Sequence, residues 1–190
     1  MSHIRPLLPE NASPEVKDIY EDFSRQMGFP APPNFIKTQG YSPSVVKGTW
    51  ELVRNVLVTG KIERWIKEMV FAAISKDRNC HYCLAAHLAC CRLLGVEPEL
   101  LDSLVRDVNS LSHLKTRDMI LFGLKCSRQP DEISEGDYEK LRKHGLREPE
   151  ILELIAMSGV AVYANIMADA TGMEADAQFD SIASAHCGRS

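Results

Sequence analysis

The sequence has almost none of the patterns that specify β-strands, because no run of alternating β-branched residues is followed by a hairpin turn. It also has no basic block, and 22 basic against 26 acidic residues give a formal charge of −4. Proteins that bind nucleic acid usually carry a basic patch or stripe, so we expect no nucleic-acid partner. The remaining composition, 45% hydrophobic and 25% charged over 190 residues, excludes wholesale disorder and predicts one domain with a hydrophobic core.

Six cysteines are too few for a small disulfide scaffold, and four of them lie within twelve residues: Cys80, Cys83, Cys90 and Cys91. The first residues, MSHIRPLLPE, show no apolar segment of an export signal. We therefore expect a reducing, cytoplasmic location. Clustered cysteines in such a compartment indicate metal binding or redox chemistry rather than architecture.

Helix start and stop signals are frequent along the chain. Ser13-Pro14 and Ser42-Pro43 each offer an N-cap followed by proline, and Ser134 with Asp137 resembles a capping box. We expect helices near residues 14–27, 43–57, 62–76, 80–94, 98–108, 113–128, 135–144 and 149–171. The other segments are expected to be an extended proline-rich connection at 30–33 and tails at 1–12 and 175–190. The predicted fold is all-α: a single domain over 1–190, built as a bundle of about seven or eight helices around a core at 30–172.

The most apolar stretch, Ile151–Ala170, only just reaches the roughly 20 residues that a membrane span needs. It also carries Glu153, Asn165 and Asp169, which are costly inside a bilayer. A helix buried in the core or at an oligomer contact explains the stretch better. We therefore expect no membrane partner.

The most informative segment is Cys80-His81-Tyr82-Cys83, followed four residues later by His87. Asn79 is a good N-cap and predicts that Cys80 lies in the first turn of a helix. On that helix Cys83 and His87 lie only about 60° and 20° around the axis from Cys80. The two thiols and the imidazole therefore share one strip. Thiols three residues apart on one face can close into a disulfide, and the helix dipole favours thiolates near this end.

A base next to the thiol is not sufficient for fast thiol chemistry. At pH 7 a thiol with a pKa of about 8.5 is only roughly 3% thiolate. Lowering that pKa by about two units gains only a few-fold in rate, because nucleophilicity falls along with it. Fast peroxide cleavage therefore needs a second group that donates a proton to the departing oxygen.

Glu68 is the candidate for this second group. On a helix over 62–76, Glu68 lies outside the polar face of that helix. It shares a row with Phe71 and Ser75, and this row could meet the Cys80–His87 strip. A half-buried carboxylate with a raised pKa would suit proton relay. The alternative is a surface ion pair with Arg64, worth only a few tenths of a kcal/mol.

Zinc binding is the alternative reading of Cys80, Cys83, His87 and Cys90, which together offer four ligands. On one straight helix the first and last of them lie about 15 Å apart along the axis, whereas the ligands of one ion must converge. We therefore expect no metal. Cys90 and Cys91 are most simply core thiols.

Glu68, Ser75 and the run from Cys80 to His87 resemble the alkyl hydroperoxidase D / carboxymuconolactone decarboxylase-like family, in its peroxidase-related branch. In that pattern a glutamate lies twelve residues before CxxC, and a histidine lies four residues after the second cysteine. The likeness covers about residues 30–172. One departure is Tyr82, because the best-known branch has a histidine directly before the second cysteine.

The resemblance implies an all-helical homo-oligomer (a dimer, trimer or hexamer) that reduces hydroperoxides without metal, flavin or other cofactor. Cys83 would be the peroxidatic thiol, Cys80 the resolving thiol, and His87 with Glu68 the proton relay. From position alone the helix dipole favours Cys80, whereas the spacing to His87 favours Cys83. An external dithiol or thiol protein would supply electrons. The alternatives are a decarboxylase, as in members without the cysteines, or a redox-sensing oligomer that binds a ligand.

Overall fold

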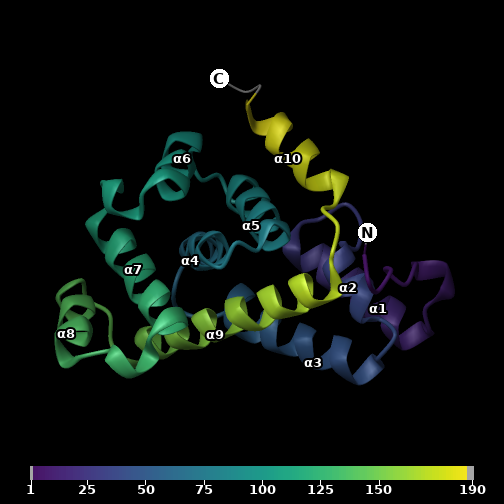
Figure 1. Cartoon of the computed structure of the whole chain (residues 1–190), viewed down its shortest axis with the longest axis horizontal. Helices are drawn as coiled ribbons and strands as arrows, with labels where there is room; N and C mark the ends of the chain where they lie inside the picture. Colours follow the sequence, from purple (N-terminus) through teal and green to yellow (C-terminus); the bar gives the residue numbers. More distant parts are fainter. Residues whose placement is uncertain (1, 188–190) are drawn as a thin grey trace.

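The computed structural model describes the backbone of residues 2–187 and the side chains of residues 2–182. The described part of the chain is all-helical, as predicted (Figure 1). Its α-helices are α1 (Pro14–Met27), α2 (Asn34–Gln39), α3 (Pro43–Val53), α4 (Arg64–Asp77), α5 (His81–Leu93), α6 (Pro98–Arg106), α7 (Leu114–Arg128), α8 (Glu135–Lys143), α9 (Glu148–Thr171) and α10 (Ala177–Cys187). Short helical turns join or extend them: η1 (Pro9–Asn11), η2 (Arg54–Val58), η3 (Val108–Ser110) and η4 (Pro130–Glu132).

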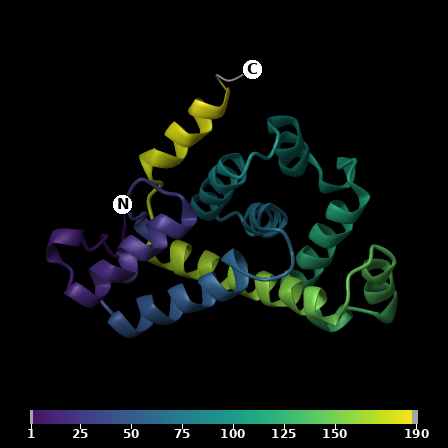
Figure 2. The same ribbon diagram turned by 180° about the vertical axis from the view of Figure 1, so that it is seen from behind.

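The central element is α4, seen end-on in Figure 1 with α5, α6, α7 and α9 around it. Every residue from Ile66 to Ser75 is buried, because α4 packs against α5, α7 and α9. The view from behind shows α1 and α3 packed together beside this group (Figure 2). A side chain on α4 can therefore reach the core on every face, which is why a glutamate here is enclosed by protein.

Several of the predicted helix ends are present. The Ser13 hydroxyl accepts a hydrogen bond from the Val16 amide at the start of α1, and Ser134 with Asp137 forms the capping box of α8. Gly95 and Gly145 follow helix ends with positive φ. The helix expected over 43–57 is α3 followed by one π-helical turn, η2.

The tight turn between α4 and α5 corrects one expectation. Asn79 is not the N-cap of α5 but ends α4, in the left-handed conformation with φ 58°. The Asn79 amide donates to the Lys76 carbonyl at 3.1 Å and the Cys80 amide to the Ser75 carbonyl at 2.9 Å, which is the Schellman pattern. Cys80 is therefore the N-cap of α5, and Cys83 is its third helical residue.

Two helices appear where the sequence predicted none, which makes ten α-helices instead of seven or eight. α2 directly follows the expected proline-rich connection, and α10 occupies most of the expected tail 175–190. The first amide of α2, on Asn34, donates to the Asp176 carboxylate 142 residues away. α10 packs on α5. Both helices thus depend on contacts between distant parts of the chain, which local sequence signals do not report.

α9 is long and apolar enough, by length and composition alone, to cross a membrane. Half of its most apolar window is buried inside the protein. The buried side includes Asn165, whose amide donates to the Ser75 hydroxyl on α4 at 3.0 Å. These contacts make α9 a core helix of the fold, and the side chains of Leu152 and Ile166 on its outer face are exposed.

The left-handed turn at Asn79 predicts an order of stability among variants. Asn79→Gly should be more stable than Asn79→Ser by about 1 kcal/mol, because only glycine adopts this conformation without steric cost. For a chain of this size that difference corresponds to about 2–4 °C in Tm, measured by thermal unfolding. An N-cap role would give the opposite order, since serine caps helices at least as well as glycine.

Candidate active site

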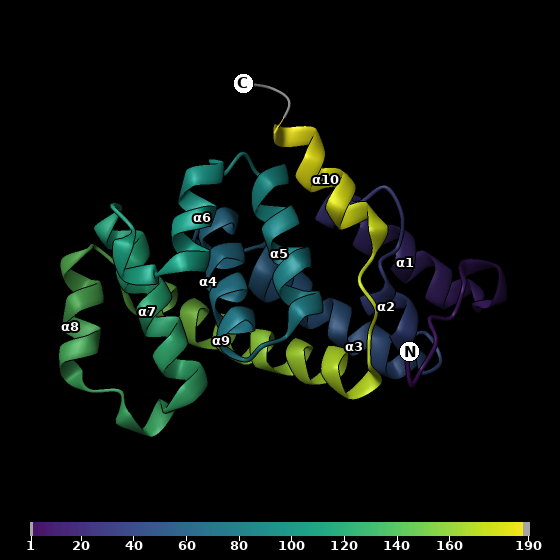
Figure 3. The same ribbon diagram turned by 45° about the horizontal axis from the view of Figure 1, so that its top comes forward.

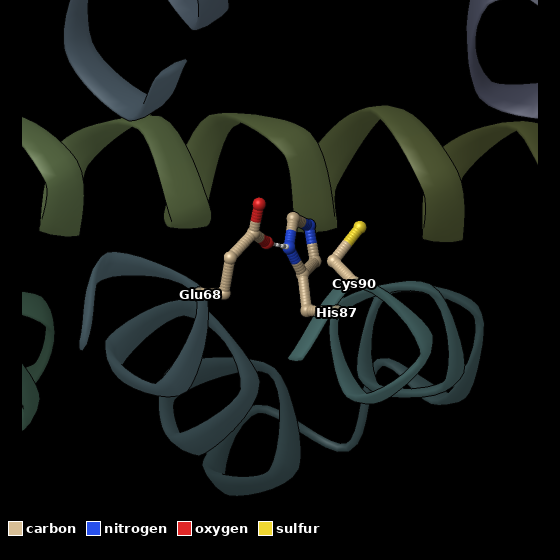
Figure 4. Close-up of side chains that lie close together, drawn as sticks. All are labelled: Glu68, His87 and Cys90. Atoms are coloured by element: carbon tan, nitrogen blue, oxygen red, sulfur yellow. Dashed lines mark hydrogen bonds and ion pairs between the residues drawn. The ribbon is translucent and has the colours of Figure 1, made fainter. Parts of the chain in front are cut away.

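Glu68 lies on α4 with its side chain fully buried. One carboxylate oxygen, Oε1, accepts from Nε of Arg64 at 3.1 Å, and the other, Oε2, lies 2.5 Å from Nδ1 of His87 on α5 (Figure 4). The Arg64 guanidinium in turn donates to the Gln26 carbonyl at the end of α1. A buried charge is strongly disfavoured unless it is paired and hydrogen-bonded, and here both oxygens are satisfied. The structure thus brings Glu68 and His87 together and also retains the predicted Arg64 pair, inside the protein rather than on its surface.

The imidazole of His87 is held in one orientation. Its ring stacks on Phe71, with ring centroids 3.4 Å apart and an interplanar angle of 18°. Because Nδ1 contacts a carboxylate, the neutral ring carries its proton there and leaves the lone pair on Nε2. The ring lines the same pocket as Cys83. His87 therefore has the tautomer and placement of a base for a group in that pocket.

The two thiols of the CxxC segment are free and buried. Their contact with each other is the largest influence on Cys83: Cys80, followed by burial, raises the pKa of the Cys83 thiol well above its ordinary value. A hydrogen bond with Asn165 acts in the opposite direction. The expectation that the helix dipole and the imidazole would favour the thiolate is therefore wrong for the resting protein, because burial and the neighbouring thiol outweigh them.

The pocket beside Cys83 is small, with a cavity volume of about 40 Å³. His87 and Cys90 share its lining with Cys83, and nearly all the rest is apolar. The apolar lining consists of Phe23, Met27, Phe29, Pro33, Phe35, Val53, Leu57, Phe71, Tyr82, Ala86 and Phe179. Since a polar solute would lose hydrogen bonds to water in such a site, the pocket suits a ligand with an organic, water-poor body.

Cys90 is a site residue that the sequence analysis treated as a plain core thiol. Among the residues that the structure describes, its sulfur converges with a Glu68 oxygen and a His87 ring nitrogen, all within 4.8 Å of one another (Figure 4). Burial raises the pKa of the Cys90 thiol, and Glu68 raises it further. The signal was available, because Cys90 follows His87 by three residues, one helical turn.

We asked whether these three side chains fit a metal ion. Ligand atoms lie about 2.0–2.3 Å from a bound zinc ion. An ion here would have to break the direct Glu68–His87 hydrogen bond, and Arg64 already neutralises the carboxylate. The cluster of Glu68, His87 and Cys90 therefore fits a hydrogen-bonded unit better than an ion site.

Ser75 and Asn165 close the side of the site next to α9. The Ser75 hydroxyl is buried and accepts from the Asn165 amide. The same amide side chain contacts Cys83, so Asn165 links α9 to the thiol. Its carbonyl oxygen, Oδ1, is buried with no partner among the described residues. Ser75 thus contacts the site through Asn165 rather than through a thiol.

Comparison with known proteins gives the fold first. No family model matches the sequence. A peroxidase-related protein of Ralstonia eutropha, described as an alkylhydroperoxidase AhpD core, has a TM-score of 0.85 at 23% identity over 94% of each chain. The debrominase Bmp8, solved with 2,3,4-tribromopyrrole, has a TM-score of 0.82 at 16% identity over 98% of each chain. The fold is therefore that of AhpD-like proteins.

Two further proteins are more similar to this chain in sequence. A peroxidase-related protein of Silicibacter sp. is 26% identical, with a TM-score of 0.81 over 93% of this chain and 94% of that one. An alkyl hydroperoxide reductase of Mycobacterium tuberculosis is 28% identical over 88 residues, 46% of this chain and 25% of that protein. The match thus spans only a quarter of that relative's length. Together with the shared fold, these are likenesses to AhpD-like and peroxidase-related proteins.

The contact between the thiols predicts a shift in the pH dependence of Cys83 alkylation. In Cys80→Ser the main influence that raises the pKa of Cys83 is removed, so the pKa falls and more thiolate is present at a given pH. Alkylation by iodoacetamide, located on Cys83 by fragment mass, should then be faster at pH 8 and have a lower midpoint. Cys126→Ser, a half-buried thiol outside the pocket, is the control. An unchanged or higher midpoint in Cys80→Ser would contradict this account.

Proposed function

We propose that the protein is a thiol-dependent peroxidase that reduces hydroperoxides through a dithiol/disulfide cycle of Cys83 and Cys80. The observation that carries the proposal is the buried chain from Arg64 through Glu68 to His87, which ends in the apolar pocket that Cys83 lines. The raised pKa of Cys83 makes this chain necessary, because the resting thiol needs a base before it can attack.

The first step moves one proton and two electrons. His87 accepts the Cys83 proton at Nε2, and the thiolate attacks the terminal oxygen of the hydroperoxide. The O–O bond breaks, an S–O bond forms, and the leaving alkoxide takes the proton back from His87. The products are the sulfenic acid of Cys83 and an alcohol.

The second step closes the disulfide. The Cys80 sulfur attacks the Cys83 sulfur, an S–S bond forms, and the hydroxyl leaves as water with the Cys80 proton. The sum is a dithiol plus hydroperoxide giving a disulfide, an alcohol and water. An external dithiol or thiol protein then returns two electrons and two protons by thiol–disulfide exchange.

Glu68 acts through His87 in this scheme. Its carboxylate holds Nδ1–H, so that the lone pair of the ring stays on Nε2, and it stabilises the imidazolium formed when Nε2 accepts a proton. Arg64 in turn holds the second carboxylate oxygen, so the carboxylate cannot rotate away.

We further propose a cytoplasmic homo-oligomer, with the exposed apolar side chains of α9 as the contact between its subunits.

Variants of the two thiols test the cycle. Cys83→Ser should lose organic-hydroperoxide turnover in stopped-flow assays, because no thiolate remains to attack oxygen. Cys80→Ser should still consume one equivalent of hydroperoxide and accumulate a sulfenic acid, visible as a mass gain of one oxygen, but should not turn over. Cys126→Ser should match the unmodified chain. Undiminished turnover in both site variants would reject the assignment.

The relay has its own test. Glu68→Gln keeps the size of the side chain but removes its charge, and we expect kcat/KM to fall by about 10²–10³-fold, within the range of general acid–base catalysis. The matched control is Glu153→Gln, a glutamate on α9 that is also ion-paired, in its case with Lys67, but lies outside the pocket. An equal loss in both variants would indicate a structural role only.

The alternatives give different results in the same assays. A carboxymuconolactone decarboxylase-like enzyme would keep its activity without both cysteines. A redox-sensing oligomer would show negligible hydroperoxide turnover together with assembly that depends on the state of the dithiol. The debrominase among the structural neighbours shows that this fold also accommodates a brominated aromatic ring, so release of bromide from a bromopyrrole is a further assay.

A further inference from the structure

We propose that Phe179, on α10, sets the size of the organic group that reaches Cys83, and that Tyr82 and Asp176 hold it in place. Phe179 is then a specificity-determining residue of the dithiol site. The substrate it selects carries a compact apolar group, bounded on its outer side by this ring. The claim about substrate choice rests on the proposed function. The claim that Phe179 limits the space beside Cys83 can be tested without any turnover.

The first observation is the position of the Phe179 ring. It is buried, although it lies near the end of the described side chains. Its centroid lies 5.5 Å from that of Phe29 and 5.7 Å from that of Tyr82, edge-on to the tyrosine at 69°. It lines the same pocket as Cys83 and His87. The ring therefore forms part of the wall around the reacting sulfur.

The second observation is how the segment before α10 is attached. The Tyr82 hydroxyl donates to the Asp176 carboxylate at 2.8 Å and accepts from the Phe35 amide at 2.9 Å. The same carboxylate accepts from the Asn34 amide at 2.9 and 3.1 Å. One buried acid thus joins α2, α5 and the start of α10. Tyr82 stays neutral throughout the physiological range, because burial and Asp176 raise its pKa well above 10.

The third observation is that Phe179 differs from the other pocket-lining residues in the helix that carries it. Phe23, Leu57 and Phe71 also line the pocket, but they belong to α1, η2 and α4 in the body of the protein. α10 instead packs mainly on α5 and extends away from the remaining helices (Figure 3). Phe179 thus lines the pocket from a helix whose main packing partner is α5, and not from α1, η2 or α4.

The position of Tyr82 within the CxxC segment explains how Phe179 is held near Cys83. The tyrosine lies directly before Cys83, so its hydroxyl fixes the outer wall relative to the reacting thiol. Hydrogen peroxide carries no organic group, so we expect its reaction at the sulfur to depend little on the size of the Phe179 side chain. An organic hydroperoxide with a large substituent must contact that ring, so the wall discriminates between substrates by size.

The kinetic test compares Phe179→Ala with Phe122→Ala. Phe122 on α7 is a matched control, since it is also buried and lies edge-on to a tyrosine, with its centroid 5.8 Å from that of Tyr138 at 68°, but outside the pocket. We expect Phe179→Ala to raise the kcat/KM ratio of cumene hydroperoxide to hydrogen peroxide by at least about tenfold, because even one methylene-sized difference in an apolar pocket is worth about that factor and this change removes a whole ring. Tyr82→Phe should raise the ratio less. An unchanged ratio, or an equal rise in Phe122→Ala, would overturn the proposal.

A second measurement keeps the proposal separate from the proposed function. In a Cys80→Ser background, Cys83 is modified with methyl or benzyl methanethiosulfonate, and the two rates are compared by mass. Phe179→Ala, or Phe179→Leu where the alanine variant does not fold, should speed benzyl transfer relative to methyl transfer. If the unmodified chain, with both thiols, shows no hydroperoxide turnover, that result would support the wall while the peroxidase is rejected. An unchanged benzyl-to-methyl ratio would overturn the wall whatever the turnover.

Discussion

The structure depends on one buried interaction, the contact between the Glu68 carboxylate and the His87 ring at the centre of the helical bundle. A carboxylate in a fully buried position costs several kcal/mol unless its oxygens are paired. Arg64 and His87 pair them, and these two residues connect α4 to the end of α1 and to α5. The same bond that makes the buried acid tolerable also fixes the tautomer of the histidine.

The electrostatics of the dithiol follow from this enclosure. Because Cys83 lies against Cys80 and away from water, its thiol is held protonated rather than activated. Reactivity in such a site has to come from proton transfer when a substrate is present, and not from a permanently lowered pKa. Burial thus places both thiols away from bulk water, beside an apolar pocket.

The outer part of the site is formed by different helices. The central helices position Glu68, His87 and Cys83, whereas α2 and α10 meet at the Asp176 carboxylate and close the pocket from outside. The catalytic groups and the pocket wall thus belong to separate parts of the molecule.

The sequence by itself determined the all-α class, most helix positions and the shared strip of Cys80, Cys83 and His87, because helical periodicity and capping are local properties of the chain. It also identified Glu68, whose face follows from the same periodicity. Only the tertiary structure decided the outcome at Asn79, which ends one helix instead of starting the next. Helical spacing places Cys90 one turn after His87, but only the packing of α5 on α4 brings both of them to Glu68. The tertiary structure alone revealed α2 and α10, because the first amide of α2 donates to Asp176, 142 residues away, and α10 packs on the distant α5, and a local pattern carries no record of such contacts.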